Sequence, residues 1–357
     1  MLRVLLLILI ISLAILFFRE KNPIPTSFVT PISPTISPTA APQKLPQYYF
    51  LPNDYQAYQT FNNCGPAALS MALSYYDIAV GQDVLGQRLR PFQNQLGDND
   101  DKSVTLDELG EASREYGFIP YHRPAGDMEL VKRAIASGVP VITRTWLREN
   151  EDIGHFRVVK GYDDAKQNLL QDDSLQGHDL TYSYELFLDL WKKFNFEYLI
   201  LIPRDNERLA IEILQEDFDE NVAWKKARDY SLNRLSQEPN DIYAALNLSV
   251  AYKKLGENQK AADTFMNIEA LLPFRTLWYQ IEPIEALAAI GEDEKVFSLS
   301  EKIINNQNRA YSELYLIRGD IYKKQGNLEA AKEEYEKAVF YNKNLKKAIA
   351  SLSSVSN

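Results

Sequence analysis

Three glycines repeat at a constant spacing of 35 residues, at Gly256, Gly291 and Gly326. A sequence period of this length is typical of stacked helical hairpins, in which each unit buries its apolar face only against its neighbours. This feature restricts the fold more than any other, because it sets both the type of element and the way the elements stack. We therefore predict an all-α solenoid for residues 204–357.

The residues around these glycines resemble tetratricopeptide repeats. The small and aromatic positions of that pattern recur at Leu248, Tyr252, Gly256, Ala261, Phe265 and Pro273, and again at Tyr315, Gly319, Tyr322, Gly326, Ala331, Tyr335 and Ala338. Between them, residues 280–304 keep the glycine and lose most of the rest, and residues 207–239 are expected to form an incomplete leading unit. The resemblance implies a surface that binds a substrate or a protein partner. The alternative is that the repeats only stabilise the preceding domain.

The N-terminal segment is almost purely apolar from residue 2 to residue 18, with Arg3 in front and 19-REK-21 behind. Its length lies between that of a signal-peptide core, about 7–15 residues, and that of a membrane span, about 20 residues. No small-residue cleavage motif follows promptly. We therefore expect residues 1–21 to form an uncleaved signal anchor or transmembrane helix.

A segment rich in Pro, Ser and Thr follows at residues 22–47. Such a composition cannot bury enough apolar surface to fold, so it predicts an extended and semi-stiff linker. Linkers of this kind commonly hold a domain away from a cell surface. The two segments together favour a membrane-anchored protein on the extracytoplasmic side over a cytoplasmic tether.

Composition excludes several classes of function. With 49 acidic and 39 basic residues the net charge is −10, which argues against a nucleic-acid partner. The single cysteine excludes an internal disulfide and a Cys-based zinc cluster. Three histidines are too few and too poorly spaced for a metal-dependent enzyme. We therefore expect neither a metal nor a cofactor.

That single cysteine precedes a predicted helix in 59-QTFNNCGPAALSMALSYY-76. The residues from Gly65 to Tyr76 leave hardly any polar face, which predicts a buried helix, and Pro66 suits its first turn. Cys64 would then lie at the N-terminal end, where unpaired backbone N–H groups and the helix dipole lower the pKa of a thiol. The alternative is that Cys64 is a small buried hydrophobic residue.

A cysteine nucleophile needs an imidazole and a group that orients the imidazole. His155 stands at the start of a predicted strand in 154-GHFRVVKGYDD-164, after a strand at residues 139–147 and before one that starts at residue 168. Antiparallel pairing of these strands would bring the Asp172–Asp173 pair beside His155. Alternation alone does not choose between the two carboxylates. His122 and His178 lie in turn-like contexts and are expected to face solvent.

The order of these residues resembles the papain-like cysteine peptidases, specifically the bacteriocin-processing leader-peptidase family. That family carries Cys-Gly-Pro on a buried helix, Gly-His-aromatic before a strand, and an acid in a D-P-x-x-G turn. Here the turn reads 173-DSLQG-177, with serine in place of proline, so the resemblance selects Asp173 as the orienting acid. It also implies that a glutamine ahead of the cysteine donates to the oxyanion; Gln59 fits, one residue closer than usual, and Gln56 is the alternative.

The resemblance implies an α+β papain-like domain over residues 48–203, in which the helix that bears the cysteine packs on an antiparallel sheet. Cys64, His155, Asp173 and Gln59 would then form the catalytic site of a membrane-tethered cysteine peptidase that cleaves peptides or proteins. The resemblance also implies a bacterial origin. Two alternatives stay open: a non-catalytic adaptor with a degenerate domain, and an amidase or acyltransferase that uses the same Cys–His pair.

Overall fold

The structure is a computed structural model that describes residues 45–92, 103–306 and 308–356. The anchor predicted for residues 1–21 lies outside these residues, as does the predicted linker up to residue 44. In the described ranges no helix combines the length and the apolar character that a membrane crossing requires.

Seven strands in the described part of the chain form a single antiparallel sheet. They are β1 (Tyr48–Phe50), β2 (Phe118–Arg123), β3 (Val141–Trp146), β4 (Gly154–Asp163), β5 (Asn168–Asp173), β6 (Gly177–Ser183) and β7 (Tyr198–Pro203). The strands lie in the order β2-β7-β3-β4-β5-β6, and β1 pairs with the far end of β4. The three strands predicted around His155 are confirmed as β3, β4 and β5.

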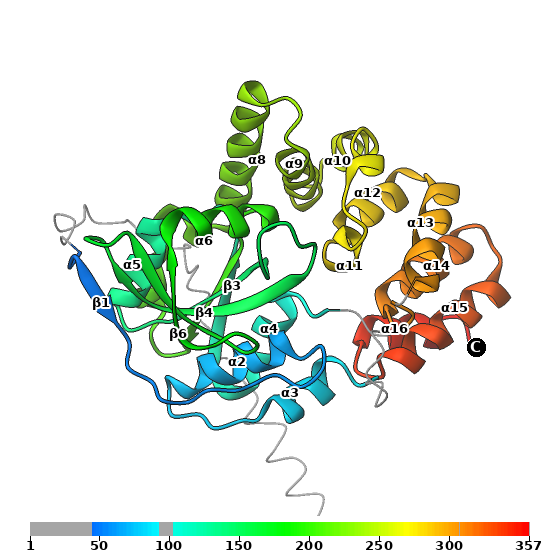
Figure 1. Ribbon diagram of the computed structural model, residues 1–357. Helices are drawn as coiled ribbons and strands as arrows, with labels where there is room; N and C mark the ends of the chain where they lie inside the picture. Colours follow the sequence, from blue (N-terminus) through cyan, green and yellow to red (C-terminus); the bar gives the residue numbers. More distant parts are fainter. Residues whose placement is uncertain (1–44, 93–102, 307, 357) are drawn as a thin grey trace, which may run out of the picture. The chain divides into compact units, whose positions relative to one another are not determined.

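The sheet is buried on both faces. Successive strand residues point to opposite sides, so neighbouring residues of one strand belong to different apolar clusters. On β7, Leu199 and Leu201 face one apolar cluster, while Ile200 and Ile202 face the other. Helices α2 (Cys64–Ser74), α3 (Gln82–Leu89) and α4 (Leu106–Ser113) cover the first face, and Figure 1 shows them together on one side of the sheet. Helices α5 (Met128–Ala136), α6 (Tyr184–Trp191) and α7 (Glu207–Leu214) cover the second face.

Helix α2 confirms the predicted buried helix, with a start one residue earlier, at Cys64. All residues from Cys64 to Leu73 are buried. Its approach to the neighbouring chain is close: a Cβ atom added at Gly65 would overlap the Val104 methyl group. Only glycine fits there, which explains why the residue after the cysteine has no side chain.

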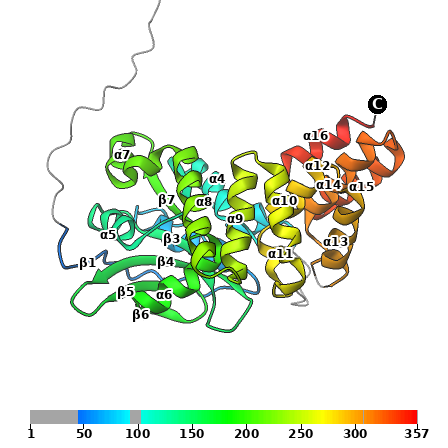
Figure 2. The same cartoon turned by 90° about the horizontal axis from the view of Figure 1, so that it is seen from above.

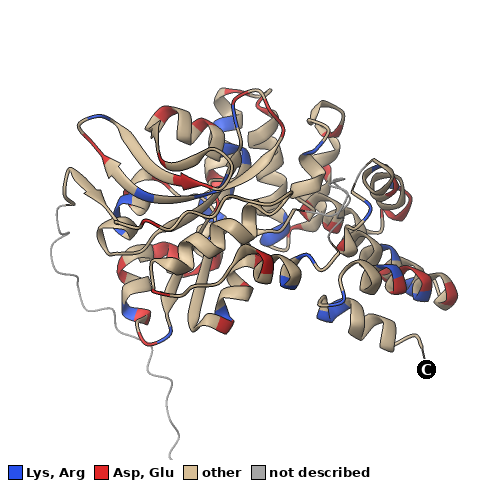
Figure 3. Ribbon diagram, turned by 60° about the horizontal axis from the view of Figure 1, so that its bottom comes forward, with Lys and Arg blue, Asp and Glu red and all other residues tan. Residues whose placement is uncertain are grey.

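The rest of the chain is helical in the part that the structure describes. Its helices are α8 (Glu220–Gln237), α9 (Ile242–Lys254), α10 (Asn258–Met266), α11 (Thr276–Tyr279), α12 (Glu282–Ile290), α13 (Asp293–Asn305), α14 (Ser312–Lys324), α15 (Leu328–Tyr341) and α16 (Lys346–Ser353). Helices adjacent in sequence pack against each other, most closely α8 with α9, α9 with α10, and α14 with α15 (Figure 2). Acidic and basic residues are interspersed along them (Figure 3).

The periodic glycines end a helix in the same way in each unit. Gly256, Gly291 and Gly326 adopt positive φ angles of 80°, 87° and 80° at the ends of α9, α12 and α14. This left-handed conformation terminates a helix and turns the chain into the next one. The Gly319–Tyr335 pair shows the packing rule of the repeat, because a Cβ atom at Gly319 would lie 2.5 Å from the Tyr335 ring. The predicted all-α solenoid is confirmed.

One part of the expected leading unit packs elsewhere. Ala210, Ile213 and Leu214 of α7 are buried in the apolar cluster of the sheet, together with α5. The prediction that residues 207–239 form a leading repeat unit is therefore wrong for α7, because its apolar side chains cover the sheet. Helix α8, in contrast, packs on α9.

The sheet and the helical region share an apolar cluster. Trp146, at the end of β3, is buried together with Phe194 and with Trp278 and Tyr279 of α11. Polar contacts join the same surfaces: Asn195 donates to the backbone carbonyl of Asn247 at 3.0 Å. The start of β4 also lies against the helical region, since a Cβ atom added at Gly154 would lie 3.0 Å from the Tyr279 ring.

Candidate active site

Cys64 is the first residue of α2 and is 5% exposed. Asn63 makes no side-chain cap to this helix, so the amides of the first turn point toward the thiol end without a competing acceptor from that residue. The helix therefore presents its positive end to the one cysteine of the chain.

His155 is held at the other side of the site by a carboxylate. Its Nε2 lies 2.8 Å from Asp173 Oδ1, and both side chains are almost fully buried. Asp173 also accepts hydrogen bonds from the backbone N–H groups of Leu175 and Gln176, each at 2.8 Å. These bonds fix the carboxylate, which in turn fixes the imidazole ring. Because Nε2 is engaged with Asp173, Nδ1 is the ring nitrogen available to the Cys64 thiol.

Electrostatics favour an ion pair between the thiol and the imidazole. Burial raises the pKa of Cys64, but the hydrogen bond and charge of His155, together with the charges of Arg90 and Arg144, outweigh it and lower that pKa below its ordinary value. Burial lowers the pKa of His155, yet the hydrogen bonds and charges of Asp173 and Cys64 raise it overall. Thiolate and imidazolium stabilise each other.

The strand register explains why Asp173, and not Asp172, meets His155. Asp173 pairs with Arg157 across the β4–β5 ladder, and Asp172 pairs with Val158. His155 and Arg157 are two residues apart on β4 and therefore point to the same face. Arg157 Nε lies 3.2 Å from Asp173 Oδ2, and this guanidinium is fully buried. The pKa of Asp173 is lowered, because the contacts to His155 and Arg157 outweigh its burial.

Sequence reasoning missed Arg157 as a support for the site. Its guanidinium donates to the backbone carbonyls of Trp146 and Leu147 at 3.0 and 2.7 Å, which ties β4 to the end of β3. The available signal was its alternation with His155 on one strand.

Arg144 is a second residue that the sequence did not single out. It is 4% exposed, stacks on the rings of Phe156, Phe194 and Tyr279 at 5.1–5.3 Å, and donates to the Tyr279 carbonyl at 3.0 Å. Its charge is one of those that lower the pKa of Cys64. A charged residue in the otherwise uncharged strand β3 was the signal.

The two candidate glutamines differ in which end of the amide is engaged. Gln59 Oε1 accepts a hydrogen bond from Ser174 Oγ at 2.8 Å, and its amide nitrogen donates to no other described residue. Gln56 Nε2 instead donates to the backbone carbonyl of Asp173 at 2.8 Å. The amide nitrogen of Gln59 is thus available to donate to an oxyanion, while its oxygen is fixed by Ser174. The amide nitrogen of Gln56 already donates to the backbone.

The second carboxylate belongs to a separate cluster. Asp172, His178 and Asp179 place donor atoms within 4.8 Å of one another, as a metal site would. Lys160 Nζ already lies 2.7 Å from Asp172 and 2.6 Å from Asp179. The three groups therefore converge on a lysine amine, which supplies the cation.

The prediction that His122 and His178 face solvent is wrong for His122 and holds only in part for His178, whose side chain is 27% exposed. His122, on β2, lies 2.6 Å from Asp107 and 2.9 Å from Glu197, and its side chain is 11% exposed. His178, on β6, lies 2.9 Å from Asp172. Both are strand residues. The partners of His122 are distant in sequence, whereas Asp172 lies on the strand next to that of His178.

Family models match both parts of the chain. Residues 47–199 match the Peptidase C39 like family, and residues 312–345 match a tetratricopeptide repeat. This chain contains a C39-like peptidase domain and a tetratricopeptide repeat. The predicted family resemblance and the predicted fold class are thus confirmed. No curated protein matches the sequence.

Solved structures similar to this chain include two peptidases and one further protein. The C39-like peptidase from Bacillus anthracis is 18% identical, covering 44% of this chain and 98% of its own, with a TM-score of 0.36. The peptidase domain of Streptococcus ComA is 21% identical, covering 42% and 97%, with a TM-score of 0.34. MamA is 20% identical, covering 37% and 77%, with a TM-score of 0.33. Because these scores are low, the assignment of the C39-like domain depends on the family model.

Proposed function

We propose that this chain is a cysteine peptidase that cleaves peptides or proteins at Cys64. The observation that supports this most is the placement of Cys64 at the N-terminus of α2 beside His155, whose Nε2 is held 2.8 Å from Asp173. A thiolate–imidazolium pair with an orienting carboxylate is the arrangement that acyl transfer through a thioester requires.

Each side chain has a defined role in the proposed reaction. The Cys64 thiolate attacks the peptide carbonyl carbon and forms a C–S bond, while the Gln59 amide and the Cys64 backbone N–H stabilise the oxyanion. His155 then gives its proton to the leaving amine as the C–N bond breaks. Water, deprotonated by His155, attacks the thioester carbon. The C–S bond then breaks, the carboxylic acid leaves, and the thiolate–imidazolium pair is restored.

The setting of the site completes the proposal. Residues 1–21 anchor the chain in a membrane, residues 22–47 hold the C39-like domain away from it on the extracytoplasmic side of a bacterial cell, and the helical region binds the substrate or a partner. The apolar N-terminus and the Pro, Ser and Thr-rich segment support this placement.

The first test is the pH dependence of Cys64 alkylation by iodoacetamide in the full chain. Because Cys64 is the only cysteine, labelling reports on this site alone. As pH falls, the rate is lost when the thiolate takes up a proton, so a lowered pKa places the midpoint well below the ordinary value of about 8.5. The His155→Ala variant is expected to return it to about 8.5. An ordinary midpoint in both proteins would favour the adaptor.

A second measurement separates peptidase from amidase or acyltransferase. The full chain is incubated with a mixture of randomised octapeptides, and cleavage is followed by mass spectrometry against Cys64→Ala. Cleavage that depends on Cys64 supports the peptidase. A reactive thiolate that consumes small amides but cuts no peptide would favour the alternative chemistry.

A further inference from the structure

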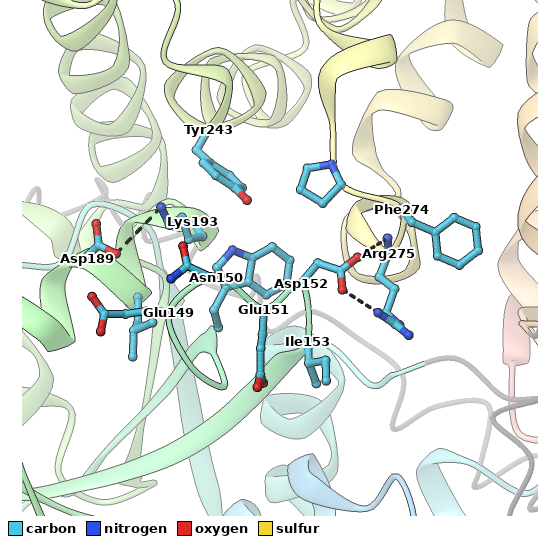
Figure 4. Close-up of a pocket in the computed structure, with 13 residues that line it drawn as sticks. Glu149, Asn150, Glu151, Asp152, Ile153, Asp189, Lys193, Tyr243, Phe274 and Arg275 are labelled. Carbon is cyan, nitrogen blue, oxygen red and sulfur yellow. Dashed lines mark hydrogen bonds and ion pairs between the residues drawn. The ribbon is translucent and has the colours of Figure 1, made fainter.

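A pocket of about 750 Å³ opens between the C39-like domain and the helical region. Its walls come from the loop between β3 and β4, from α6 and the turn after it, from α9, and from the segment before α11 (Figure 4). We propose that this pocket binds a lysine or arginine side chain of the polypeptide that the active site cleaves. The identity of the ligand as a substrate segment rests on the proposed peptidase function.

The charge of the lining favours a cation. Four acidic side chains, Glu149, Glu151, Asp152 and Asp189, line the pocket with two basic ones, Lys193 and Arg275. The net charge of the lining is therefore −2, although two cations are already present. This excess negative charge would repel an anionic ligand, whereas it would attract a basic side chain.

Both lining cations are engaged with groups of the pocket wall. Arg275 Nη1 lies 2.5 Å from Asp152 Oδ1, and the Arg275 backbone N–H donates to the same carboxylate at 3.1 Å. Lys193 Nζ stands over the Tyr243 ring at 4.3 Å and is 3.9 Å from Asp189. Figure 4 shows these pairs on opposite sides of the pocket. Neither cation neutralises Glu149 or Glu151.

Glu151 has a carboxylate oxygen that lacks a donor. Its Oε2 is buried and accepts no hydrogen bond from the described residues, while Oε1 is 3.5 Å from Arg148 Nη1. The Glu151 side chain is 33% exposed, so its negative charge adds to the field in the pocket. Glu149 is exposed at the same rim and adds a second negative charge.

Aromatic residues suit the stem of such a side chain. Trp146, Tyr243 and Phe274 line the pocket, and aromatic faces bind both the methylene groups and the charged ends of lysine and arginine. A long basic side chain therefore matches the lining better than a small metal ion, which needs only oxygen ligands.

The pocket lies at the start of the strand that carries His155. Trp146 pairs with Gly154 across the β3–β4 ladder, and Ile153 lines the pocket. His155 is the next residue of β4. The proposal places the carbonyl of the bound polypeptide at Cys64 and a neighbouring basic side chain in this pocket, so that selection in the pocket acts on the bond that is cut.

The test measures binding without turnover. Full-length Cys64→Ala is immobilised and incubated with randomised octapeptides. Unbound peptides are washed away, and the peptides that remain bound to the protein are sequenced by mass spectrometry. We expect lysine and arginine to be enriched about fivefold at one position. Adding Glu149→Gln and Glu151→Gln together should abolish the enrichment, whereas Glu301→Gln, an exposed acid of α13 outside the pocket, should leave it unchanged.

Retention of peptides without basic enrichment, or enrichment that survives the double substitution, would overturn the proposal. Because Cys64→Ala cannot cleave, this result does not depend on catalysis. Basic enrichment in Cys64→Ala, combined with no cleavage by the wild-type chain, would support the pocket and overturn the peptidase.

Discussion

Two histidine–aspartate pairs lie next to each other on β4, β5 and β6, and only one meets a thiol. Asp172 and Asp173 are consecutive and fully buried. Asp173 holds His155 beside Cys64, while Asp172 holds His178 and Lys160. A carboxylate–imidazole pair is therefore not a catalytic site by itself. The third group, a thiol at a helix N-terminus or a lysine amine, decides what the pair does.

The largest difference between the two pairs is expected in catalysis. His155→Ala should lower Cys64-dependent peptide cleavage on the order of 10³-fold, because both the thiolate partner and the proton donor are lost. His178→Ala should stay within about threefold of wild type, since the polar contacts of His178 with described residues are to Asp172, Asp179 and Lys160. The rates are measured by mass spectrometry on the octapeptide mixture. Equal losses in both variants would remove the distinction.

The next difference concerns the two carboxylates. Asp172→Asn leaves Lys160, whose side chain is 2% exposed, with the largely exposed Asp179 as its one carboxylate partner among the described residues. It should lower the free energy of unfolding by about 3 kcal/mol. Asp172→Asn should keep the wild-type midpoint of alkylation, whereas Asp173→Asn should raise it. Urea unfolding and the alkylation profile measure the two effects.

A matched double variant checks the cause of that instability. Lys160→Met combined with Asp172→Asn removes both partners, so most of the lost stability should return. If the double variant were as unstable as Asp172→Asn, the buried amine would not be the reason.

The proposed nucleophile and base could be predicted from the sequence because each lies in a short local pattern. Cys64 precedes a run with no polar face, and His155 opens a strand of alternating residues. The residues that surround the proposed triad could not be predicted from a local sequence pattern. Arg157 meets Asp173 only because of the β4–β5 register, which shifts at a bulge between Val159 and Gly161.

Contacts between the C39-like domain and the helical region were even harder to predict from the sequence. Asp152 and Arg275 are 123 residues apart, and neither belongs to a motif. Helix α7 also has the apolar spacing of a repeat helix, and nothing local indicates that it covers the sheet. Periodicity predicts which residues are apolar, but not which surface buries them.

The third histidine extends the comparison to a pair of carboxylates without a nucleophile. His122 lies between Asp107 and Glu197, and Lys254 of α9 is 3.4 Å from Asp107. Burial lowers the pKa of His122, but the charge and hydrogen bond of Asp107, followed by those of Glu197, raise it to about 9. We expect no role for His122 in alkylation of Cys64, only in stability.

The sign of the pH dependence follows from the raised pKa. A folded-state pKa above the unfolded value of about 6.5 means that the stabilisation is fully present below pH 6.5 and is lost as pH rises through about 9. Its size should be roughly 2 kcal/mol, since Asp107 is largely exposed and solvent screens that partner. The difference in unfolding free energy between wild type and His122→Gln should therefore shrink from pH 6.5 to pH 10. Other titrating groups cancel in this difference, so a constant value across that range would show that His122 is not held as an imidazolium.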